Sequence, residues 1–341
     1  MVKKKIRRTR LVDGGGSYFS NPTTNLSFIR SGATTLDCTV GNGWPLGRIV
    51  NIVGDKSTGK TLLAIEAMAN FARQYPKGKI VYAESEAAFI PDYAEALGLP
   101  LDRVQFQKDV DTVEVLFDNL KDFVAARRKR NQEGLYILDS LDALTDEDEK
   151  KSDMRKGSYG MKKPKQMSSL FRRLVREVEK SNVCVIVISQ IRDNIGVTFG
   201  RKYSRSGGKA LDFYASIVLY LAHLGEIRRT IRGIKRTVGV NIRAKCTKNK
   251  IGLPFRVCDF PIIFAYGIED VVANLLWLEE NKQIEASGLS RKEFRKIKKR
   301  AMCGQLKENE YRNVQIKLSK VVKKCWGEIE TSFLPKRRKY N

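Results

Sequence analysis

One short segment limits what this chain can fold into. It matches the pattern G-x-x-x-x-G-K-[ST] and lies between an apolar β-branched run, 48–53, and a helical pattern that begins at Leu62. A strand, a glycine-rich loop and a helix in this order form a phosphate-binding loop, because glycines let successive backbone N–H groups face phosphates. The candidate nucleotide-binding residues are Gly54, Asp55, Lys56, Ser57, Thr58, Gly59, Lys60 and Thr61.

Within this loop, two side chains carry most of the expected chemistry. Lys60 is placed to neutralise the β- and γ-phosphate oxygens of ATP, and the Thr61 hydroxyl is placed to bind Mg²⁺. Mg²⁺ needs a second, acidic ligand, and the candidate is Asp139, which directly follows the apolar run 135–138. Glu86 follows the run 80–83 and is a candidate base for the attacking water. Glu84 is its competitor, and spacing alone does not choose between the two carboxylates.

The surrounding pattern predicts an α/β fold with a mostly parallel twisted sheet flanked by helices. Apolar runs without polar alternation are typical of strands buried on both faces, and here they alternate with helical patterns. After Ser216, strand-like runs follow one another without intervening helices, which predicts antiparallel strands at the sheet edge. The expected strands are 48–53, 80–83, 135–138, 183–188, 217–222, 238–246 and 258–265.

Composition changes along the chain predict three parts. Residues 1–28 are basic and then rich in Gly, Ser and Asn, so we expect a flexible arm. Residues 29–268 form the expected nucleotide-binding core. Residues 269–341 are helix-rich and basic, and we expect a small C-terminal domain with a tail.

Charge indicates the kind of partner. The chain has 64 Lys and Arg against 38 Asp and Glu, a formal net charge of +26, and the basic residues cluster at both ends and in 291–300. Such clusters favour DNA or RNA over a small acidic substrate. No amphipathic apolar face accompanies the terminal clusters, so we expect no membrane partner. The chain has no long apolar stretch and its first residues contain no apolar signal core, so we expect a soluble, cytoplasmic protein.

Two classes of active site are excluded. His223 is the sole histidine, and it lies in an apolar run that predicts a strand, so a Ser-His-Asp or Cys-His apparatus is not supported. The six cysteines show no C-x-x-C spacing, which argues against a zinc site and a disulfide framework.

Taken together, the motifs resemble those of the RecA recombinases in order and spacing over about 30–285. The matching segments are Ser31-Gly-Ala-Thr-Thr-Leu-Asp37, Gly47-Arg-Ile-Val50, the phosphate-binding loop, Glu86, Tyr93-Ala-Glu-Ala-Leu-Gly98, Leu138-Asp-Ser140, Ser189-Gln-Ile-Arg192, Gly196-Val-Thr-Phe-Gly200, Gly207-Gly208-Lys-Ala-Leu-Asp-Phe-Tyr-Ala-Ser216, Lys248-Asn-Lys250 and Pro254-Phe255. The resemblance implies a RecA-type P-loop core and an ATP- and Mg²⁺-dependent activity.

This resemblance also assigns roles to single residues. Glu86 takes the position of the catalytic glutamate, and Gln190 takes that of the residue that senses the γ-phosphate. Lys248 and Lys250 match lysines that reach the ATP of a neighbouring subunit. Tyr93 matches a base-stacking residue. Ile90 stands where bacterial members commonly have an aspartate that reads the adenine amino group.

For DNA, the resemblance implies two loops, roughly 150–165 and 192–209. Basic residues with interleaved aromatics suit a single strand, because cations neutralise phosphates and a ring can stack on bases. Arg243 and Lys245 match a secondary DNA site. The implied DNA-binding residues are Lys165, Arg172, Arg192, Phe199, Arg201, Lys202, Arg205, Gly207, Gly208, Lys209, Arg243 and Lys245.

The resulting prediction is a recombinase that forms homo-oligomeric filaments on single-stranded DNA and exchanges it with a homologous duplex, with single-strand-binding or loader proteins as further partners. Two alternatives stay open. One is a ring-forming helicase-like motor, and the other is an accessory DNA-binding ATPase that assists another recombinase. Bacterial members typically end in an acidic tail, whereas Lys336, Arg337, Arg338 and Lys339 make this end basic.

Overall fold

The computed structural model describes residues 26–86, 89–145, 162–193, 203–205 and 209–337. Their central feature is a sheet with the strand order β12-β11-β10-β9-β3-β7-β6-β4-β5. Its parallel part confirms the α/β prediction. The parallel strands are β3 (Ile49–Gly54), β4 (Lys79–Glu84), β5 (Val104–Gln107), β6 (Gly134–Asp139), β7 (Val183–Asp193) and β9 (Ile217–Ile231).

The edge after β9 is antiparallel, as the consecutive strand-like runs predicted. It consists of β10 (Ile234–Asn249), β11 (Val257–Ile263) and β12 (Gly267–Ile268). The short β8 (Tyr203–Arg205) pairs antiparallel with the end of β7, and β1 (Phe28–Ile29) pairs with β2 (Trp44–Pro45) in a separate ribbon.

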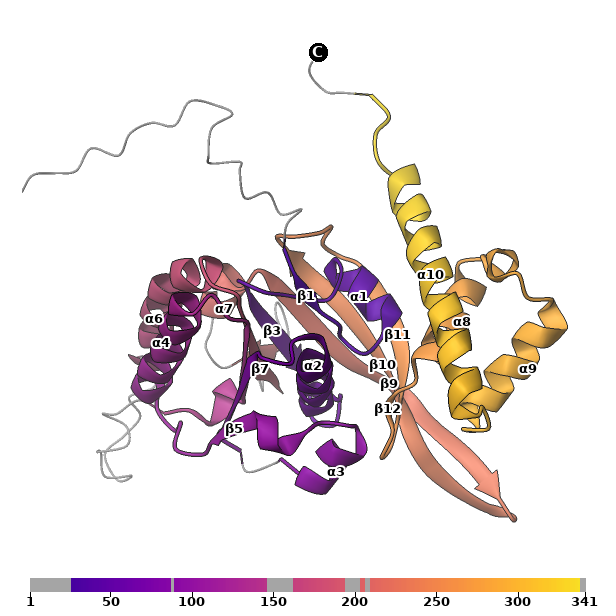
Figure 1. The fold of residues 1–341 in the computed structure, drawn as a ribbon, viewed down its shortest axis with the longest axis horizontal. Helices are drawn as coiled ribbons and strands as arrows, with labels where there is room; N and C mark the ends of the chain where they lie inside the picture. Colours follow the sequence, from indigo (N-terminus) through magenta and orange to yellow (C-terminus); the bar gives the residue numbers. More distant parts are fainter. Residues whose placement is uncertain (1–25, 87–88, 146–161, 194–202, 206–208, 338–341) are drawn as a thin grey trace, which may run out of the picture.

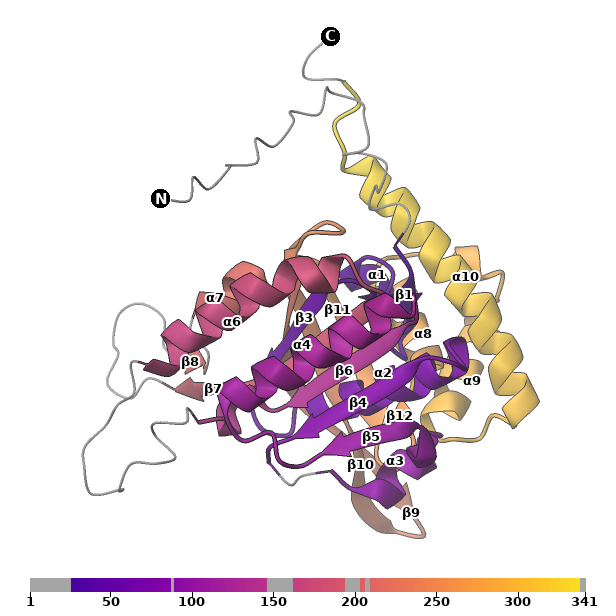
Figure 2. The same cartoon turned by 60° about the vertical axis from the view of Figure 1, so that its left-hand side comes forward.

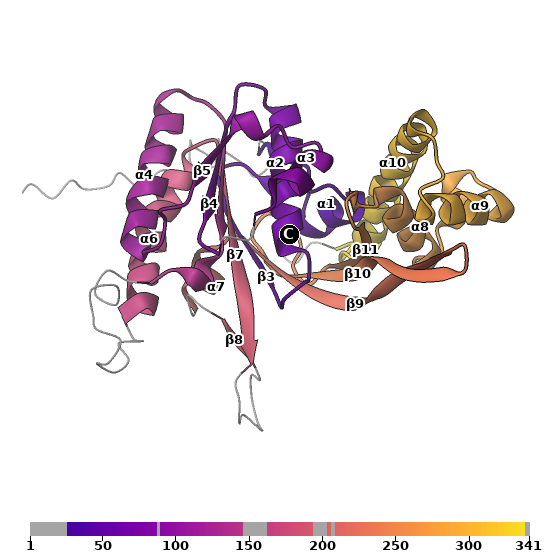
Figure 3. The ribbon, with the colours of Figure 1, turned by 90° about the horizontal axis from the view of Figure 1, so that it is seen from below.

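Helices cover both faces of the parallel strands (Figure 3). On one face lie α1 (Thr34–Val40), α2 (Lys60–Gln74) and α3 (Pro91–Ala96), with the short 3-10 helix η3 (Leu101–Arg103) near α3. On the other lie α4 (Val113–Lys129), α6 (Lys162–Glu179) and α7 (Lys209–Tyr214), with η4 (Leu141–Ala143). Each face buries its own apolar cluster, and strand residues alternate between them: Val50 and Ile52 face α2, whereas Ile49 and Val53 face α6.

The C-terminal helices build a third apolar cluster at the antiparallel edge of the sheet (Figure 1). They are α8 (Asp270–Glu280), α9 (Arg291–Met302) and α10 (Glu308–Ser332), with η5 (Ile284–Ser287) between α8 and α9. Trp277 stacks on Trp326 at a centroid distance of 5.4 Å, which ties α8 to α10. Thr34 of α1 joins both helices to the core, because its hydroxyl contacts Asp270 at 3.1 Å and Ser319 at 2.8 Å.

Strands β9 and β10 are longer than the sequence predicted. Their apolar runs, 217–222 and 238–246, mark only the part that packs in the sheet, and the basic segment between them continues both strands into a hairpin. This hairpin projects away from the core beside the C-terminal helices (Figures 1 and 3). Apolar periodicity misses it because the residues 228–237 are exposed, apart from the half-buried Arg229.

Within the described ranges, no helix combines the length and apolar character that a membrane-crossing segment needs. The apolar helix faces are instead covered by the sheet or by other helices. Figure 2 shows α4 lying beside β6, with α6 next to α4 on the same side of the sheet.

Candidate nucleotide site and DNA interface

The candidate nucleotide-site residues converge because their strands are parallel neighbours. Strands β3, β7, β6 and β4 lie side by side in this order, so their carboxyl ends meet at one edge of the sheet. The phosphate-binding loop follows β3, Asp139 ends β6, Glu86 follows β4, and Gln190 lies near the end of β7. This edge is where ligands bind in open α/β sheets.

The loop between β3 and α2 has the backbone of a phosphate cradle. Gly59 is the residue before α2 and has φ +83°, and Ser57 also has a positive φ of 58°. A Cβ on Gly54 would come within 2.5 Å of the Thr58 hydroxyl, so the close approach requires glycine there. The Lys60 Nζ donates to the Asp55 carbonyl oxygen at 2.7 Å, across the mouth of the loop.

Thr61 and Asp139, the two residues expected to hold Mg²⁺, contact each other. The Thr61 hydroxyl donates to the Asp139 Oδ2 at 2.7 Å, and the buried Tyr82 hydroxyl donates to the same oxygen at 2.8 Å. Burial raises the pKa of Asp139, while these two hydrogen bonds oppose the rise. Burial also lowers the pKa of Lys60, and the nearby carboxylates of Asp139 and Glu86 oppose that change. Hard oxygen donors beside a phosphate cradle are the donor set that Mg²⁺ prefers, so the residues fit this ion.

The two competing glutamates have different surroundings. The Glu86 Oε1 accepts hydrogen bonds from the Ser140 hydroxyl and from the Gln190 Nε2, the latter at 2.7 Å. Glu84 instead turns toward the chain that follows it, where its Oε1 accepts the Phe89 N–H at 2.8 Å. Glu86 is therefore the carboxylate in contact with the groups at the strand ends.

Gln190 is held at both its backbone and its side chain. Its backbone N–H donates to Asp142 Oδ2 at 2.6 Å, and its side chain donates to Glu86. Directly beyond it, Ile191, Arg192 and Asp193 pair with β8, so Gln190 stands at the base of a hairpin. The nucleotide edge and this hairpin are thus joined through one residue.

Tyr93 lies in α3, and Ile90 directly precedes this helix. Tyr93 is half-buried against the core cluster of α2, and burial raises its pKa. Ile90 precedes α3 and is 62% exposed, so it presents an apolar surface at the position where the family commonly has an aspartate.

Lys248 and Lys250 lie away from the phosphate-binding loop of their own chain. In the register of the sheet, Lys248 pairs with Val218, which pairs with Asn51 in β3, three residues before Gly54. The Lys248 Nζ donates to the carbonyls of Asp212 and Phe213 at 2.5 and 2.8 Å, at the carboxyl end of α7. Lys250 is exposed. Lys248 therefore reaches the face of the sheet that carries α7, whereas Lys60 begins α2 on the other face.

The implied DNA residues are described only in part. Lys165 and Arg172 are exposed and seven residues apart on α6, so they share one helix face. Arg192, Arg205 and Lys209 belong to the backbones of β7, β8 and α7. Phe199, Arg201, Lys202, Gly207 and Gly208 lie outside the described residues, as does most of the first loop.

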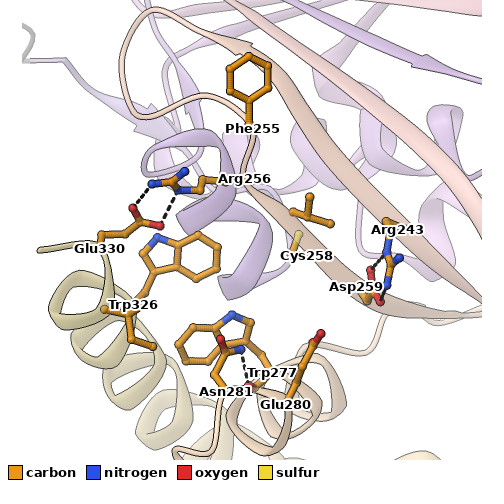
Figure 4. A pocket seen from close by; sticks show the side chains of 12 residues that line it. Arg243, Phe255, Arg256, Cys258, Asp259, Trp277, Glu280, Asn281, Trp326 and Glu330 are labelled. Atoms are coloured by element: carbon orange, nitrogen blue, oxygen red, sulfur yellow. Dashed lines mark hydrogen bonds and ion pairs between the residues drawn. The ribbon is translucent and has the colours of Figure 1, made fainter. Parts of the chain in front are cut away.

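Arg243 and Lys245 are exposed on one face of β10. Arg243 makes a two-pronged ion pair with Asp259 of β11, with distances of 2.8 and 2.7 Å (Figure 4). The pair borders a pocket of about 280 Å³ that also contains Trp277 and Trp326. On the other side of this pocket, Arg256 pairs with Glu330 of α10.

Three site residues were missed by sequence reasoning as separate candidates. Tyr82, Ser140 and Asp142 position Asp139, Glu86 and Gln190 respectively. Ser140 had a usable signal, because it directly follows Asp139 in the segment Leu138-Asp-Ser140 that was already singled out. The side chains of Tyr82 and Asp142 carry no such signal, since their partners come from other strands.

This fold and edge define a P-loop nucleotide-binding protein with a parallel core sheet. The family model of the RecA N-terminal domain matches residues 10–269. Protein RecA of Trichodesmium erythraeum (strain IMS101) is 35% identical over 265 residues, which cover 76% of this chain and 69% of that protein. Protein RecA of Chlamydia pneumoniae is 32% identical over 280 residues, covering 81% and 76%.

Protein RecA of Nostoc punctiforme (strain ATCC 29133 / PCC 73102) is 36% identical over 242 residues, which cover 70% of this chain and 64% of that protein. The chain therefore belongs to the RecA family of ATP-dependent DNA recombinases. This membership confirms the resemblance and favours a recombinase over the ring-forming motor and the accessory ATPase.

Proposed function

We propose that this RecA-family protein polymerises on single-stranded DNA in the cytoplasm, pairs it with a homologous duplex and exchanges strands, with ATP hydrolysed at the subunit interfaces. The observation that carries this proposal is the contact of Gln190 with Glu86 at 2.7 Å. It connects the carboxylate beside the phosphate-binding loop to the hairpin that leads into the second DNA loop. A change at the γ-phosphate can thereby alter the order of that loop.

In the proposed site, Lys60 and the backbone of 54–59 hold the phosphates, and Thr61 with Asp139 would hold Mg²⁺. The ion, when bound, neutralises charge on the transferred phosphoryl oxygens. Glu86 accepts a proton from the attacking water, and Ser140 with Gln190 orients its carboxylate. Tyr93 stacks against the base. The exposed Ile90 offers no polar group to the adenine edge, so selectivity among bases is expected to be weak.

Lys248 and Lys250 are proposed to act on the ATP of the neighbouring subunit. The place of Lys248 two strands away from β3, with its Nζ on the α7 side of the sheet, supports this role. Exposed apolar side chains on adjoining segments support an interface there, since Phe213 is 71% exposed and Phe255 is 66% exposed. Single-strand-binding or loader proteins are proposed as further partners.

For DNA, we propose that single strands follow the exposed face of α6 and the hairpin after Gln190, with the two loops closing the channel. Lys165 and Arg172 supply phosphate contacts on α6. The proposed set continues through the second loop and ends on β10: Arg192, Phe199, Arg201, Lys202, Arg205, Gly207, Gly208, Lys209, Arg243 and Lys245.

A division into a basic arm (1–28), an ATPase core (29–268) and a basic C-terminal part (269–341) belongs to the same proposal. The separate apolar cluster of the C-terminal helices supports the second boundary. Polar contacts from Thr34 to Asp270 and Ser319 show that this part is nonetheless attached to α1.

The test is ATP hydrolysis with and without single-stranded DNA, followed by strand exchange between a circular single strand and a linear duplex. The intact protein should hydrolyse ATP faster with DNA, and Lys60→Ala should abolish this turnover because the β- and γ-phosphates lose their cation. Lys129→Ala, at the exposed end of α4, is the matched control and should behave as the intact protein. DNA-independent turnover with no strand exchange would contradict the proposal.

A further inference from the structure

The hairpin of β9 and β10 ends in a ribbon with which no other strand of the described residues pairs. Strand β3 pairs with β9 only as far as Leu221, and β11 pairs with β10 only from Gly239 onward. The ribbon beyond these points therefore consists of two strands alone. Its last four β9 residues, Arg228–Ile231, extend about 13 Å at a rise of about 3.3 Å per residue.

A tight turn closes the ribbon and places two isoleucines at its tip. Arg232 and Gly233 form the turn and have φ values of 51° and 77°, as in a two-residue type I′ hairpin. Ile231 pairs with Ile234 directly across the strands, and the two side chains are 67% and 57% exposed. The tip is therefore a narrow apolar edge that the part of the chain described by the structure leaves uncovered.

Behind this edge the ribbon is strongly basic. Residues 226–238 contain five Lys and Arg and one acidic residue, Glu226, whose carboxylate already pairs with Arg228 at 2.9 Å. Arg236 pairs across the strands with Arg229, on the same face as the two isoleucines. Like charges directly opposite each other destabilise a hairpin, so the exposed Arg236 is suited to an anion such as a phosphate.

A neighbouring element adds to this charge. The Arg229 guanidinium donates to the carbonyl oxygen of Met302, the last residue of α9. The exposed residues of α9 include Arg291, Lys292, Arg295, Lys296 and Lys299. The ribbon and α9 thus stand next to each other, and both carry positive charge to the same end of the molecule (Figure 1).

We propose that the tip of this ribbon is a wedge that enters duplex DNA, with Ile231 and Ile234 inserted between base pairs and Arg232, Lys235 and Arg236 on the flanking phosphates. This inference rests on the proposed function for its purpose: unstacking a base step in a captured duplex exposes bases for comparison with the bound single strand. Isoleucine is among the side chains that unstack base steps from the minor groove, and a two-stranded ribbon is one of the elements that enter DNA grooves.

The observations favour a duplex over other polyanions. A single strand is read by aromatic stacking, and the residues 226–238 contain no Phe, Tyr or Trp. A membrane-binding element needs a broad apolar face, whereas this tip offers one pair of isoleucines. A duplex offers both kinds of partner that this tip needs, since a base step can take a narrow apolar edge and the flanking phosphates can take the cations beside it.

The experiment uses the full chain and a duplex that contains 2-aminopurine, whose fluorescence rises when the base is unstacked. The duplex has no homology to any single strand present, and it is titrated both alone and with a filament on an unrelated single strand. I231S/I234S removes the apolar edge, and I231L/I234L keeps it. K235E/R236E reverses the charge of two of the three residues proposed to contact phosphates. Ile316→Ser, at an exposed isoleucine of α10, is the matched control.

We expect the intact protein, I231L/I234L and Ile316→Ser to raise the fluorescence several-fold. I231S/I234S should bind the duplex within about two-fold of the intact protein by anisotropy but lose most of the fluorescence rise. K235E/R236E should weaken duplex binding by about ten-fold at low salt, whereas K129E/R130E on α4 should not.

An unchanged fluorescence rise in I231S/I234S would overturn the wedge, and so would unchanged duplex affinity in K235E/R236E. Stronger binding of the intact protein to anionic vesicles than to duplex, lost in I231S/I234S, would overturn it in favour of a membrane surface. Single-strand-stimulated ATP hydrolysis is measured in parallel. If the intact protein showed no single-strand-stimulated hydrolysis, the proposed function would be refuted. The titration with duplex alone would still test whether the ribbon tip unstacks base pairs.

Discussion

Glu84 and Glu86 are two residues apart, yet only Glu86 contacts the groups at the strand ends. Glu86→Gln should lower DNA-stimulated ATP hydrolysis by about a hundred-fold or more, because an amide cannot accept the proton of the attacking water. ATP affinity should change little. The measurements are steady-state turnover and nucleotide binding by fluorescence.

Glu84→Gln is the comparison for that variant, since it makes the same chemical change on the other carboxylate. Its amide oxygen can still accept the Phe89 N–H, so turnover should stay near that of the intact protein. If Glu84→Gln were the inactive variant and Glu86→Gln the active one, the role proposed for Glu86 would be wrong.

Arg243 illustrates how a DNA residue can be restrained by its own chain. Its guanidinium is held by Asp259 at 2.7 and 2.8 Å, and it must leave that carboxylate to reach a phosphate. Exposed ion pairs contribute about 0.2–1 kcal/mol, so Asp259→Asn should tighten duplex binding by up to about five-fold.

Fluorescence anisotropy with a short duplex at fixed salt measures this effect. Glu328→Gln on α10 adds the same unit of net charge at an exposed carboxylate that pairs with Lys324. A gain of equal size in both variants would show that net charge, and not the release of Arg243, strengthens binding.

At the scale of elements, α2 and β12 meet at a carboxyl group. Glu66 of α2 accepts the Ile268 N–H at 3.1 Å, and burial raises its pKa to about 7, while that hydrogen bond and the charge of Arg73 oppose the rise. When the pKa of a carboxyl is higher in the folded than in the unfolded protein, the free energy of unfolding falls as the pH rises from about 4.5 to about 7. Above pH 7 the cost is constant.

Glu66→Gln removes this titration and keeps an acceptor for Ile268. It should therefore stabilise the protein above pH 7 by up to about 3 kcal/mol, with the gain fading toward pH 4.5. Urea unfolding at pH 5 and pH 8 measures the difference, and the exposed Glu95→Gln is the control. A gain that is equal at both pH values would contradict the assignment to Glu66.

The same scale shows how far sequence reasoning reaches. The buried strands β3, β6 and β7 were predicted within a few residues of their starts, because their apolar runs are continuous and end at polar residues. The helices α1, α3 and α7 were not predicted, since they are short and their apolar residues form no long period. The hairpin tip was missed because its strands depend on pairing with each other and bury nothing.

The site divides in a similar way. Lys60, Thr61 and Asp139 follow from a local motif and a strand end, and the structure brings them together. The choice of Glu86 over Glu84, and the parts played by Tyr82 and Asp142, depend on contacts between strands that are distant in sequence. Spacing along one strand carries no information about those contacts.

At the scale of the whole molecule, the opposite placement of Lys60 and Lys248 makes a prediction about mixtures. K248A/K250A and Lys60→Ala should each be inactive alone, because every interface then lacks one set of cations. In a mixture, an interface that joins Lys60 of the first variant to the lysines of the second is complete. About a quarter of interfaces are complete in a randomly mixed equimolar filament, so about a quarter of normal turnover should return.

ATP hydrolysis on single-stranded DNA at a series of mixing ratios tests this. Maximal activity is expected when the two variants are present in equal amounts. Lys60→Ala alone, at the total protein concentration of the mixture, should show no activity. Failure of every ratio to restore turnover, with both variants still co-assembled on DNA, would show that Lys248 and Lys250 do not act across subunits.

The position of β3 also determines when the nucleotide site can exist during synthesis. Strand β3 lies between β7 and β9, so the strand before the phosphate-binding loop lacks its β7 neighbour until residues up to about Gln190 are made, and it lacks its β9 neighbour until about Leu221. At about 5–20 residues per second, this interval lasts roughly 10–30 s. During this interval the apolar β3 and the face of α2 lack one or both flanking strands, so the nascent chain exposes apolar surface, and nucleotide can stabilise the protein only afterwards.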